Sequence, residues 1–155
     1  AKPEDVAAKC VAVAAEVKAL EKEKAELNAK IAASQTGDVM ANAVAVGKVR
    51  AATVQLTDVS ADALRKMGDE IKDKNPDAVV VFASVNGSSA SLLCVCGKEA
   101  VAAGANAGKI IKETAAVTGG KGGGRPDSAM AGAGDVSLIG KALEAVPSIV
   151  GNFVK

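Results

Sequence analysis

The sequence contains no histidine, tryptophan or tyrosine, and its only aromatic residues are Phe82 and Phe153. Without histidine, the chain lacks the commonest general acid–base and the commonest metal ligand of proteins. The lack of aromatic rings leaves exposed nucleobases few stacking partners. No apolar run reaches the roughly 20 residues of a membrane-spanning helix, and the first ten residues have neither the basic start nor the apolar core of a signal peptide. We therefore expect neither histidine-based catalysis nor a membrane protein.

Strong charge of either sign is also missing, because 19 basic residues face 18 acidic ones and the net charge is +1. Nucleic-acid-binding domains are usually strongly basic, so any contact with nucleic acid must come from a local patch. The odd number of cysteines, Cys10, Cys94 and Cys96, favours reduced thiols in a cytoplasmic protein over a disulfide framework. A length of 155 residues fits a small domain with an appendage. Because the sequence has no initiator Met, we expect a fragment of a longer protein.

The N-terminal segment, residues 1–36, is predicted to be a helical arm with a heptad seam. Its seam positions are spaced alternately by four and three residues: Val6, Cys10, Val13, Val17, Leu20, Lys24, Leu27 and Ile31. This spacing is typical of a coiled coil, in which a single polar seam residue such as Lys24 sets register or oligomeric state. An amphipathic helix packed on its own domain is the alternative. Residues 34–38 are predicted to end the helix, with Gly37 as the stop.

Residues 37–155 are predicted to form one globular α/β domain. We expect strands over residues 49–56, 78–83 and 91–96, with a hairpin turn at Asn86–Gly87, and a strand or a short buried segment over residues 39–46. Helices are predicted over residues 58–74, with Ser60 as the N-cap, 100–117 and 136–146, where Pro147 marks an end or a kink. The predicted order is α-β-β-α-β-β-α-loop-α. The fold class is α/β (α+β), with two layers and a small mixed sheet.

A glycine-rich loop is predicted over residues 119–125, where five of the first six residues are glycine. Consecutive glycines expose backbone N–H groups, which form an anion site where they converge. Lys121 adds a point charge, and Arg125 adds a planar fork that grips a phosphate or lies on a base. A mobile surface turn is the alternative. The spacing matches neither a P-loop nor a dinucleotide-binding fingerprint.

Other polar candidates are interpreted as structural. Cys94 and Cys96 alternate by two and therefore point to one face of a strand, as a buried core pair without enough partners for zinc. Asp127 and Asp135 fit turn and N-cap roles better than a pair of catalytic carboxylates. The serines after the hairpin turn have no base to activate them. We therefore expect no catalytic and no metal-binding residue.

The stretch GGKGGGRPDSAMAG, residues 119–132, resembles the glycine motif near the C-terminus of alanyl-tRNA synthetases, in the domain associated with DHH phosphoesterases. The upstream stretches LRKMGDEI, VVVF and AGKIIK agree with that layout, so the resemblance covers essentially the whole chain. It implies a non-catalytic domain that binds the outer corner, or elbow, of tRNA and assists aminoacylation and editing. The expected RNA-binding residues are Gly119, Gly120, Lys121, Gly122, Gly123, Gly124, Arg125, Lys109 and Lys112.

The resemblance also implies partners and cofactors. The arm dimerises in some members of this family, so a homodimer is expected through the apolar seam residues Val6, Cys10, Val13, Val17, Leu20, Leu27 and Ile31. No cofactor is expected here, because ATP, magnesium and zinc would be bound elsewhere in a cytoplasmic parent ligase. Two alternatives stay open: an oligomerisation module, and the substrate domain of a DHH-type phosphoesterase. Arg125 stands where the phosphoesterases carry a histidine, which favours binding over hydrolysis.

Overall fold

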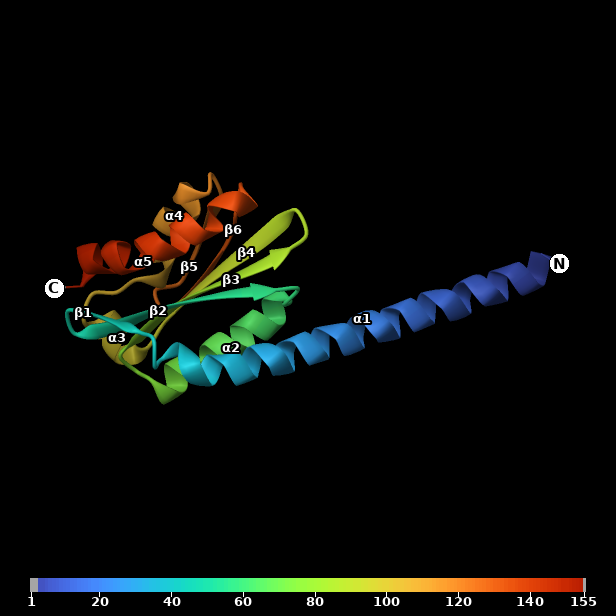
Figure 1. The fold of residues 1–155 in the computed structure, drawn as a ribbon, viewed down its shortest axis with the longest axis horizontal. Helices are drawn as coiled ribbons and strands as arrows, with labels where there is room; N and C mark the ends of the chain where they lie inside the picture. The colour runs from blue at the N-terminus through green and yellow to red at the C-terminus, as the bar shows by residue number, and fades with distance from the viewer. Residues whose placement is uncertain (1–2, 155) are drawn as a thin grey trace.

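A computed structural model describes residues 3–154, apart from the side chains of residues 3–5, 29, 32–33 and 35–38. A long N-terminal helix precedes an α/β body (Figure 1). The helices are α1 Pro3–Val39, α2 Ala61–Lys74, α3 Lys98–Ala102, α4 Ala107–Val117 and α5 Ile139–Phe153, with a 3-10 turn at Val136–Leu138. The strands are β1 Val44–Val46, β2 Val49–Thr57, β3 Ala78–Asn86, β4 Ser89–Cys96, β5 Lys121–Gly124 and β6 Ser128–Gly132. The predicted α/β fold class with a mixed sheet is confirmed, but helices cover both faces of the sheet, so the body has three layers rather than the two expected.

The body is built on a six-stranded mixed sheet in the order β1-β2-β3-β4-β6-β5. Strands β2 and β3 pair in parallel, with α2 as their crossover, and the other neighbouring strands pair antiparallel. The turn predicted at Asn86–Gly87 joins β3 to β4, and Gly87 adopts a left-handed φ of 63°. Because β6 rather than β5 pairs with β4, the glycine-rich segment becomes the edge of the sheet.

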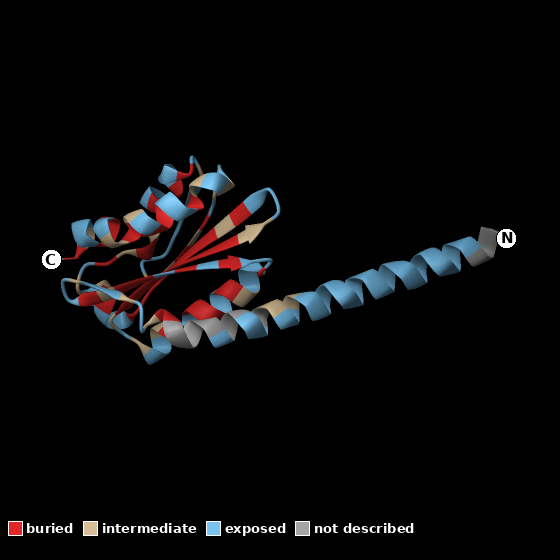
Figure 2. Ribbon diagram, in the orientation of Figure 1, coloured by how far each residue is buried: buried red, intermediate tan, exposed pale blue. Residues whose placement is uncertain are grey.

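The central strands of the sheet are largely buried (Figure 2), and their alternating side chains form an apolar cluster on each face. On one face, which we call the α4 face, Val79, Val81 and Cys94 pack with the buried sides of α4 and α5. On the other, the α2 face, Val80, Phe82 and related residues pack against α2. Leu64, Met67 and Ile71 supply the apolar stripe of α2, as the sequence predicts, and Ser60 accepts the hydrogen bond expected of an N-cap. Apolar side chains of the sheet and of the helices therefore form a core on each face of the sheet.

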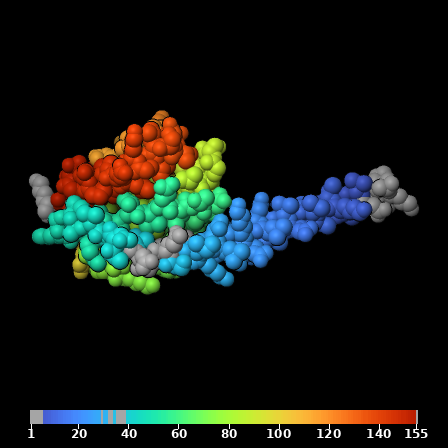
Figure 3. All heavy atoms as spheres, viewed as in Figure 1, coloured from blue at the N-terminus to red at the C-terminus, as the bar shows by residue number. Residues whose placement is uncertain are grey.

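Helix α1 leaves the body as an arm, and most of its length stands clear of the globular part (Figures 1 and 3). The prediction that residues 34–38 end this helix is wrong, since the backbone remains helical to Val39. Val39 is buried in the cluster on the α2 face, so the helix end is anchored by core packing. The apolar side chains from Val6 to Leu20 are exposed. The division of the chain at residue 36 stays a prediction.

Among the described side chains, an ion pair joins the arm to the body. Lys24 Nζ lies 3.3 Å from Asp58 Oδ2, and Asn28 Nδ2 donates to the Asp58 carbonyl at 3.1 Å. Asp58 is the single described non-glycine residue with a left-handed φ, 54°, and it directly follows β2. The polar residue that interrupts the seam thus has a partner within its own chain.

Two helix predictions are corrected at their ends. The helix expected over residues 100–117 is divided into α3 and α4, because Gly104 adopts a φ of 108° and Asn106 then caps α4. The last helix continues past Pro147 to Phe153, since proline at this point removes one backbone donor without ending the helix. Asp135 caps the 3-10 turn before that helix by accepting from Ser137 N at 2.9 Å.

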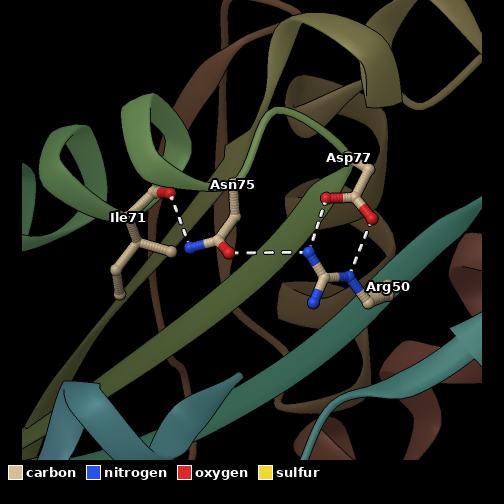
Figure 4. A network of polar contacts seen from close by, with 4 residues as sticks. All are labelled: Arg50, Ile71, Asn75 and Asp77. Atoms are coloured by element: carbon tan, nitrogen blue, oxygen red, sulfur yellow. Dashed lines mark hydrogen bonds and ion pairs between the residues drawn. The ribbon is translucent and has the colours of Figure 1, made fainter. Parts of the chain in front are cut away.

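A polar network closes the end of the sheet where β2 and β3 begin (Figure 4). Arg50 donates from Nε and Nη2 to the two Asp77 carboxylate oxygens, each at 2.7 Å, and its Nη2 also lies 3.5 Å from Asn75 Oδ1. The hydrogen bonds from Arg50 hold the pKa of Asp77 below its ordinary value. The network therefore connects β2 to the turn that precedes β3.

Among the described residues, no helix has both the length and the apolarity to cross a bilayer.

Candidate nucleic-acid interface

The glycine-rich segment is a hairpin, and the prediction of an irregular loop over residues 119–125 is wrong in this respect. Residues 121–124 form β5, which pairs with β6, and Arg125 N donates to Ser128 O at 3.0 Å across the connecting turn. Part of its main chain is therefore already hydrogen-bonded within the sheet. All of β5 remains exposed because it is an edge strand.

Close packing explains most glycines of the hairpin. A Cβ atom at Gly122 would overlap Ala131, and one at Gly124 would lie 2.7 Å from the Cα of Ala129. A Cβ at Gly120 would overlap the carbonyl oxygen of Gly132. Cβ atoms do not approach other atoms this closely in proteins, so the backbones of β5 and β6 meet only because these positions are glycine.

The two cations of the motif are exposed on this hairpin. Lys121 begins β5, and Arg125 follows its last residue. Within the part of the chain that the structure describes, neither side chain has a hydrogen-bond or ion-pair partner. Lys121, Gly123 and Arg125 alternate along the strand direction and therefore share one face. That face is the α2 face, since Gly123 pairs with Met130 and Met130 packs against the α2-face cluster.

Lys109 and Lys112 lie on a different element from these cations. Both are exposed on α4, which packs against the α4 face through Ile110, Ile111 and Ala115. Helix α4 runs beside β5, and Gly120 N donates to Ala115 O at 2.8 Å. The two lysines therefore flank the hairpin from the other side of the sheet.

A cavity of about 550 Å³ opens between α2 and the glycine hairpin. Helix α2 contributes Arg65, Asp69 and Lys72 to its lining, and none of these was predicted from the sequence as a site residue. The hairpin and β6 supply the remaining wall: Gly123, Gly124, Arg125, Asp127, Ser128, Ala129 and Met130. Helical spacing places the three α2 residues on one side of the helix. Only the strand order shows that this side faces the glycine motif.

Lys72 is held between two carboxylates. Its Nζ lies 2.7 Å from Asp69 Oδ1 and 3.4 Å from Asp127 Oδ2, and these interactions, with the Asp69 hydrogen bond first, raise the pKa of Lys72 above its ordinary value. Asp127 also accepts the Cys96 backbone N–H at 2.9 Å through its carbonyl. The turn role predicted for Asp127 is therefore combined with an ion pair between α2 and the hairpin.

The cysteine pair is structural, as predicted. Cys94 and Cys96 are both buried on the α4 face and both are free thiols. A hydrogen bond with Cys96 and burial raise the pKa of the Cys94 thiol, which keeps it neutral. Among the described residues, no group of three or more His, Cys, Asp or Glu side chains is placed to hold a metal ion.

Comparison with known families gives a match to the DHHA1 domain over residues 44–152. The crystal structure of the C-Ala domain from Aquifex aeolicus alanyl-tRNA synthetase is similar, with a TM-score of 0.66 and 25% identity over 71% of this chain and 98% of that one. A DHH-domain structure described as a member of a family of ribosomal proteins shares the fold alone, with a TM-score of 0.51 and 14% identity, covering 81% of this chain and 32% of that one.

Curated relatives are alanine–tRNA ligases. The chain is 40% identical over 148 residues to the ligase of Acetivibrio thermocellus, covering 96% of this chain and 17% of the relative. It is 35% identical over 153 residues to the ligase of Bacillus thuringiensis, covering 99% of this chain and 17% of the relative. The chain thus spans about a sixth of the length of the curated relatives it matches.

Proposed function

The chain belongs to the DHHA1 domain family, and from this premise we propose that it is the tRNA-binding C-terminal domain of a cytoplasmic alanine–tRNA ligase. In this proposal it contacts the elbow of the tRNA and assists both aminoacylation and the editing of mischarged tRNA. It has no catalytic centre of its own, and ATP, magnesium and zinc are bound by the rest of the ligase. The similarity to alanine–tRNA ligases along nearly all of this chain supports the assignment.

The observation that carries the proposal is the exposed glycine hairpin with two unpaired cations on one face. Lys121 and Arg125 are free to contact phosphates because no carboxylate of the described chain neutralises them. The glycines between them present main chain without side chains to an approaching RNA surface. Arg125 combines a bidentate phosphate contact with a planar surface for stacking.

Charge and composition set the expected strength of this binding. With a net charge of +1, long-range attraction to RNA is weak and only a few phosphates are neutralised. Aromatic stacking is unavailable at the hairpin, because Phe82 is buried in the sheet and Phe153 lies at the end of α5. We therefore expect modest affinity from this domain, with the rest of the ligase supplying selectivity for alanine tRNA.

Titration of tRNA at several salt concentrations tests the proposal. Lys121→Ala combined with Arg125→Ala should weaken binding and lower the slope of log affinity against log salt by about two, since two phosphate contacts are removed. The matched control is Lys48→Ala with Lys141→Ala. It removes the same charge from the β1–β2 turn and from α5. Equal binding by the two double variants would remove the hairpin from the interface.

We further propose that α1 pairs with a second copy of the chain. The observation that favours this is the row of exposed apolar residues Val6, Cys10, Val13, Val17 and Leu20, where Val13 is 57% exposed. A helix stripe of this kind is stabilised when a partner helix covers it. At Lys24 the body contacts the arm through Asp58, so pairing is centred on the residues before Lys24, and Leu27 and Ile31 contribute beside the body.

Sedimentation equilibrium of the whole chain measures this pairing. Val13→Glu with Val17→Glu should lower the mass to that of one chain, because charges would then lie in the seam. Ala8→Glu with Ala15→Glu adds the same charge on the opposite side of the helix and should leave the mass unchanged. A single-chain mass for the unaltered protein would refute the dimer.

A further inference from the structure

The glycines of the hairpin differ in what requires them: packing requires three of them, a left-handed φ of 70° requires Gly119, and neither requires Gly123 or Gly132. Gly120, Gly122 and Gly124 are required by the fold, because a Cβ atom at each would overlap or crowd β6 and its following residue. Gly123 is different, since a Cβ atom there would meet no atom within 4 Å. Its φ lies outside the left-handed region, so its backbone conformation does not require glycine either. Neither packing nor conformation within the chain explains this glycine.

Gly123 opens toward the cavity between α2 and the hairpin. It pairs with Met130, and residues opposite each other in a ladder point to the same face. Met130 packs against the cluster on the α2 face and lines the same cavity. The missing side chain of Gly123 therefore leaves a flat floor, made of main chain and the half-buried Met130.

The charges around this floor suit a singly charged anion. Arg125 has no ion-pair partner among the described residues, and the partner of Arg65 is Asp62, 3.6 Å away with a side chain 87% exposed. Such exposed pairs are weak, so Arg65 is available to a ligand. Asp69 of α2 and Asp127 of the hairpin line the same cavity and are bridged by Lys72. These carboxylates repel a phosphate monoester, whose charge is about −1.5 to −2, more than a phosphodiester with a single charge.

We propose that this cavity seats a stretch of the RNA sugar–phosphate backbone. One phosphodiester is held by Arg65 of α2 and its neighbour by Arg125, and a sugar lies on Gly123 and Met130. The cavity, at about 550 Å³, extends beyond a single phosphate group. Lys72 is a positioning residue that ties α2 to the hairpin through Asp127. This inference rests on the proposed function and adds to it the face of the sheet on which RNA lies and the part played by α2.

The experiment compares two single variants with two matched controls, in tRNA titrations of the whole chain at several salt concentrations. Arg65→Gln should weaken binding about tenfold at low salt and lower the salt slope by about one, as expected for one lost phosphate contact. Its control, Lys66→Gln, removes the same charge from the next position of α2, which does not line the cavity. The affinity of this control for tRNA should stay within about twofold of that of the unaltered chain.

Gly123→Ala should weaken binding about fivefold or more without changing the salt slope, because the added methyl occupies ligand space and leaves the charge unaltered. Its thermal midpoint should not fall, since the methyl meets no protein atom. The control Gly140→Ala adds a methyl in similarly open space on α5, across the sheet, and should bind as the unaltered chain does. Inorganic phosphate in millimolar excess should not displace tRNA.

Four outcomes would decide the matter. Loss of binding in both Arg65→Gln and Gly123→Ala, with both controls normal, supports the inference. Normal binding by those two variants, with weakened binding by the Lys121 and Arg125 double variant, overturns the inference and leaves the proposed function standing. Displacement of tRNA by inorganic phosphate would show a simple anion site and would also overturn it. An unaltered chain that does not bind tRNA would overturn the inference and the proposed function together.

Discussion

The arm and the sheet use the same aliphatic residues in opposite ways. Val13 and Val17 of α1 are 57% and 48% exposed, whereas Val79, Val80 and Val81 of β3 are fully buried. The difference is that β3 lies between two other strands with helices on both faces, while most of α1 has no neighbouring layer in its own chain. Burial, and hence stability, is thus decided by what surrounds a residue rather than by its type.

The largest expected effect lies in the sheet. Phe82→Ala should lower the free energy of unfolding by about 3–5 kcal/mol, because it removes the largest fully buried side chain and leaves a cavity. Val11→Ala, at an exposed arm position outside the seam, should change it by less than about 0.5 kcal/mol. Urea denaturation of both variants, followed by circular dichroism, measures the contrast. Similar losses in the two variants would show that the arm is packed in solution.

A smaller effect is expected for the ion pairs of the two regions. Asp77→Asn should lower the free energy of unfolding by about 1 kcal/mol, because the Arg50–Asp77 pair is bidentate and partly buried. Lys24→Gln should cost less than about 0.5 kcal/mol, since the Lys24–Asp58 pair is exposed. Urea denaturation at pH 7 measures both. A larger loss for Lys24→Gln than for Asp77→Asn would reverse the comparison.

The sign of the pH dependence follows from the lowered pKa of Asp77, whose main cause is the hydrogen bond from Arg50. Asp77 loses its proton at a lower pH in the folded state than in the unfolded state. The ionised carboxylate therefore contributes its full stabilisation of the folded state above the ordinary pKa of about 4. It is lost as the pH falls through the lower, folded-state pKa. The stability difference between the unaltered chain and Asp77→Asn should therefore be constant from pH 8 to about pH 5 and shrink below about pH 4.

The sequence correctly predicted features that depend on interactions between residues close together along the chain. Ser60 is an N-cap because its side chain accepts the Ala63 N–H three residues later, and the apolar stripe of α2 follows the helical period. The alternation of Cys94 and Cys96 likewise predicted their common buried face. The end of a helix that depends on contacts with residues distant in the sequence was not predicted. The helical backbone at residues 34–38 continues to Val39, which is anchored in a core that local signals do not report.

The same limit applies to the candidate site. The sequence singled out the motif from Gly119 to Arg125, because clustered glycines with two cations are visible in any local window. The segment was expected to be a loop, since glycine has a low strand propensity. Pairing with β6 decided otherwise, and that pairing is possible because Gly122 and Gly124 allow the two backbones to approach. Arg65 and Lys72 were missed because they belong to α2, which two strands and two helices separate from the motif along the chain.

The sequence alone determined the alternation of apolar residues in strands, their helical spacing, the caps and the hairpin turn. It also determined where the glycines and their neighbouring cations lie along the chain. Each of these features depends on residues only a few positions apart. Only the tertiary structure decided that β6 lies between β4 and β5, that Lys24 contacts Asp58, and that Lys109 and Lys112 lie across the sheet from Gly123. The physical reason is that strand order and helix placement minimise exposed apolar area over the whole chain. No short stretch of residues contains that information.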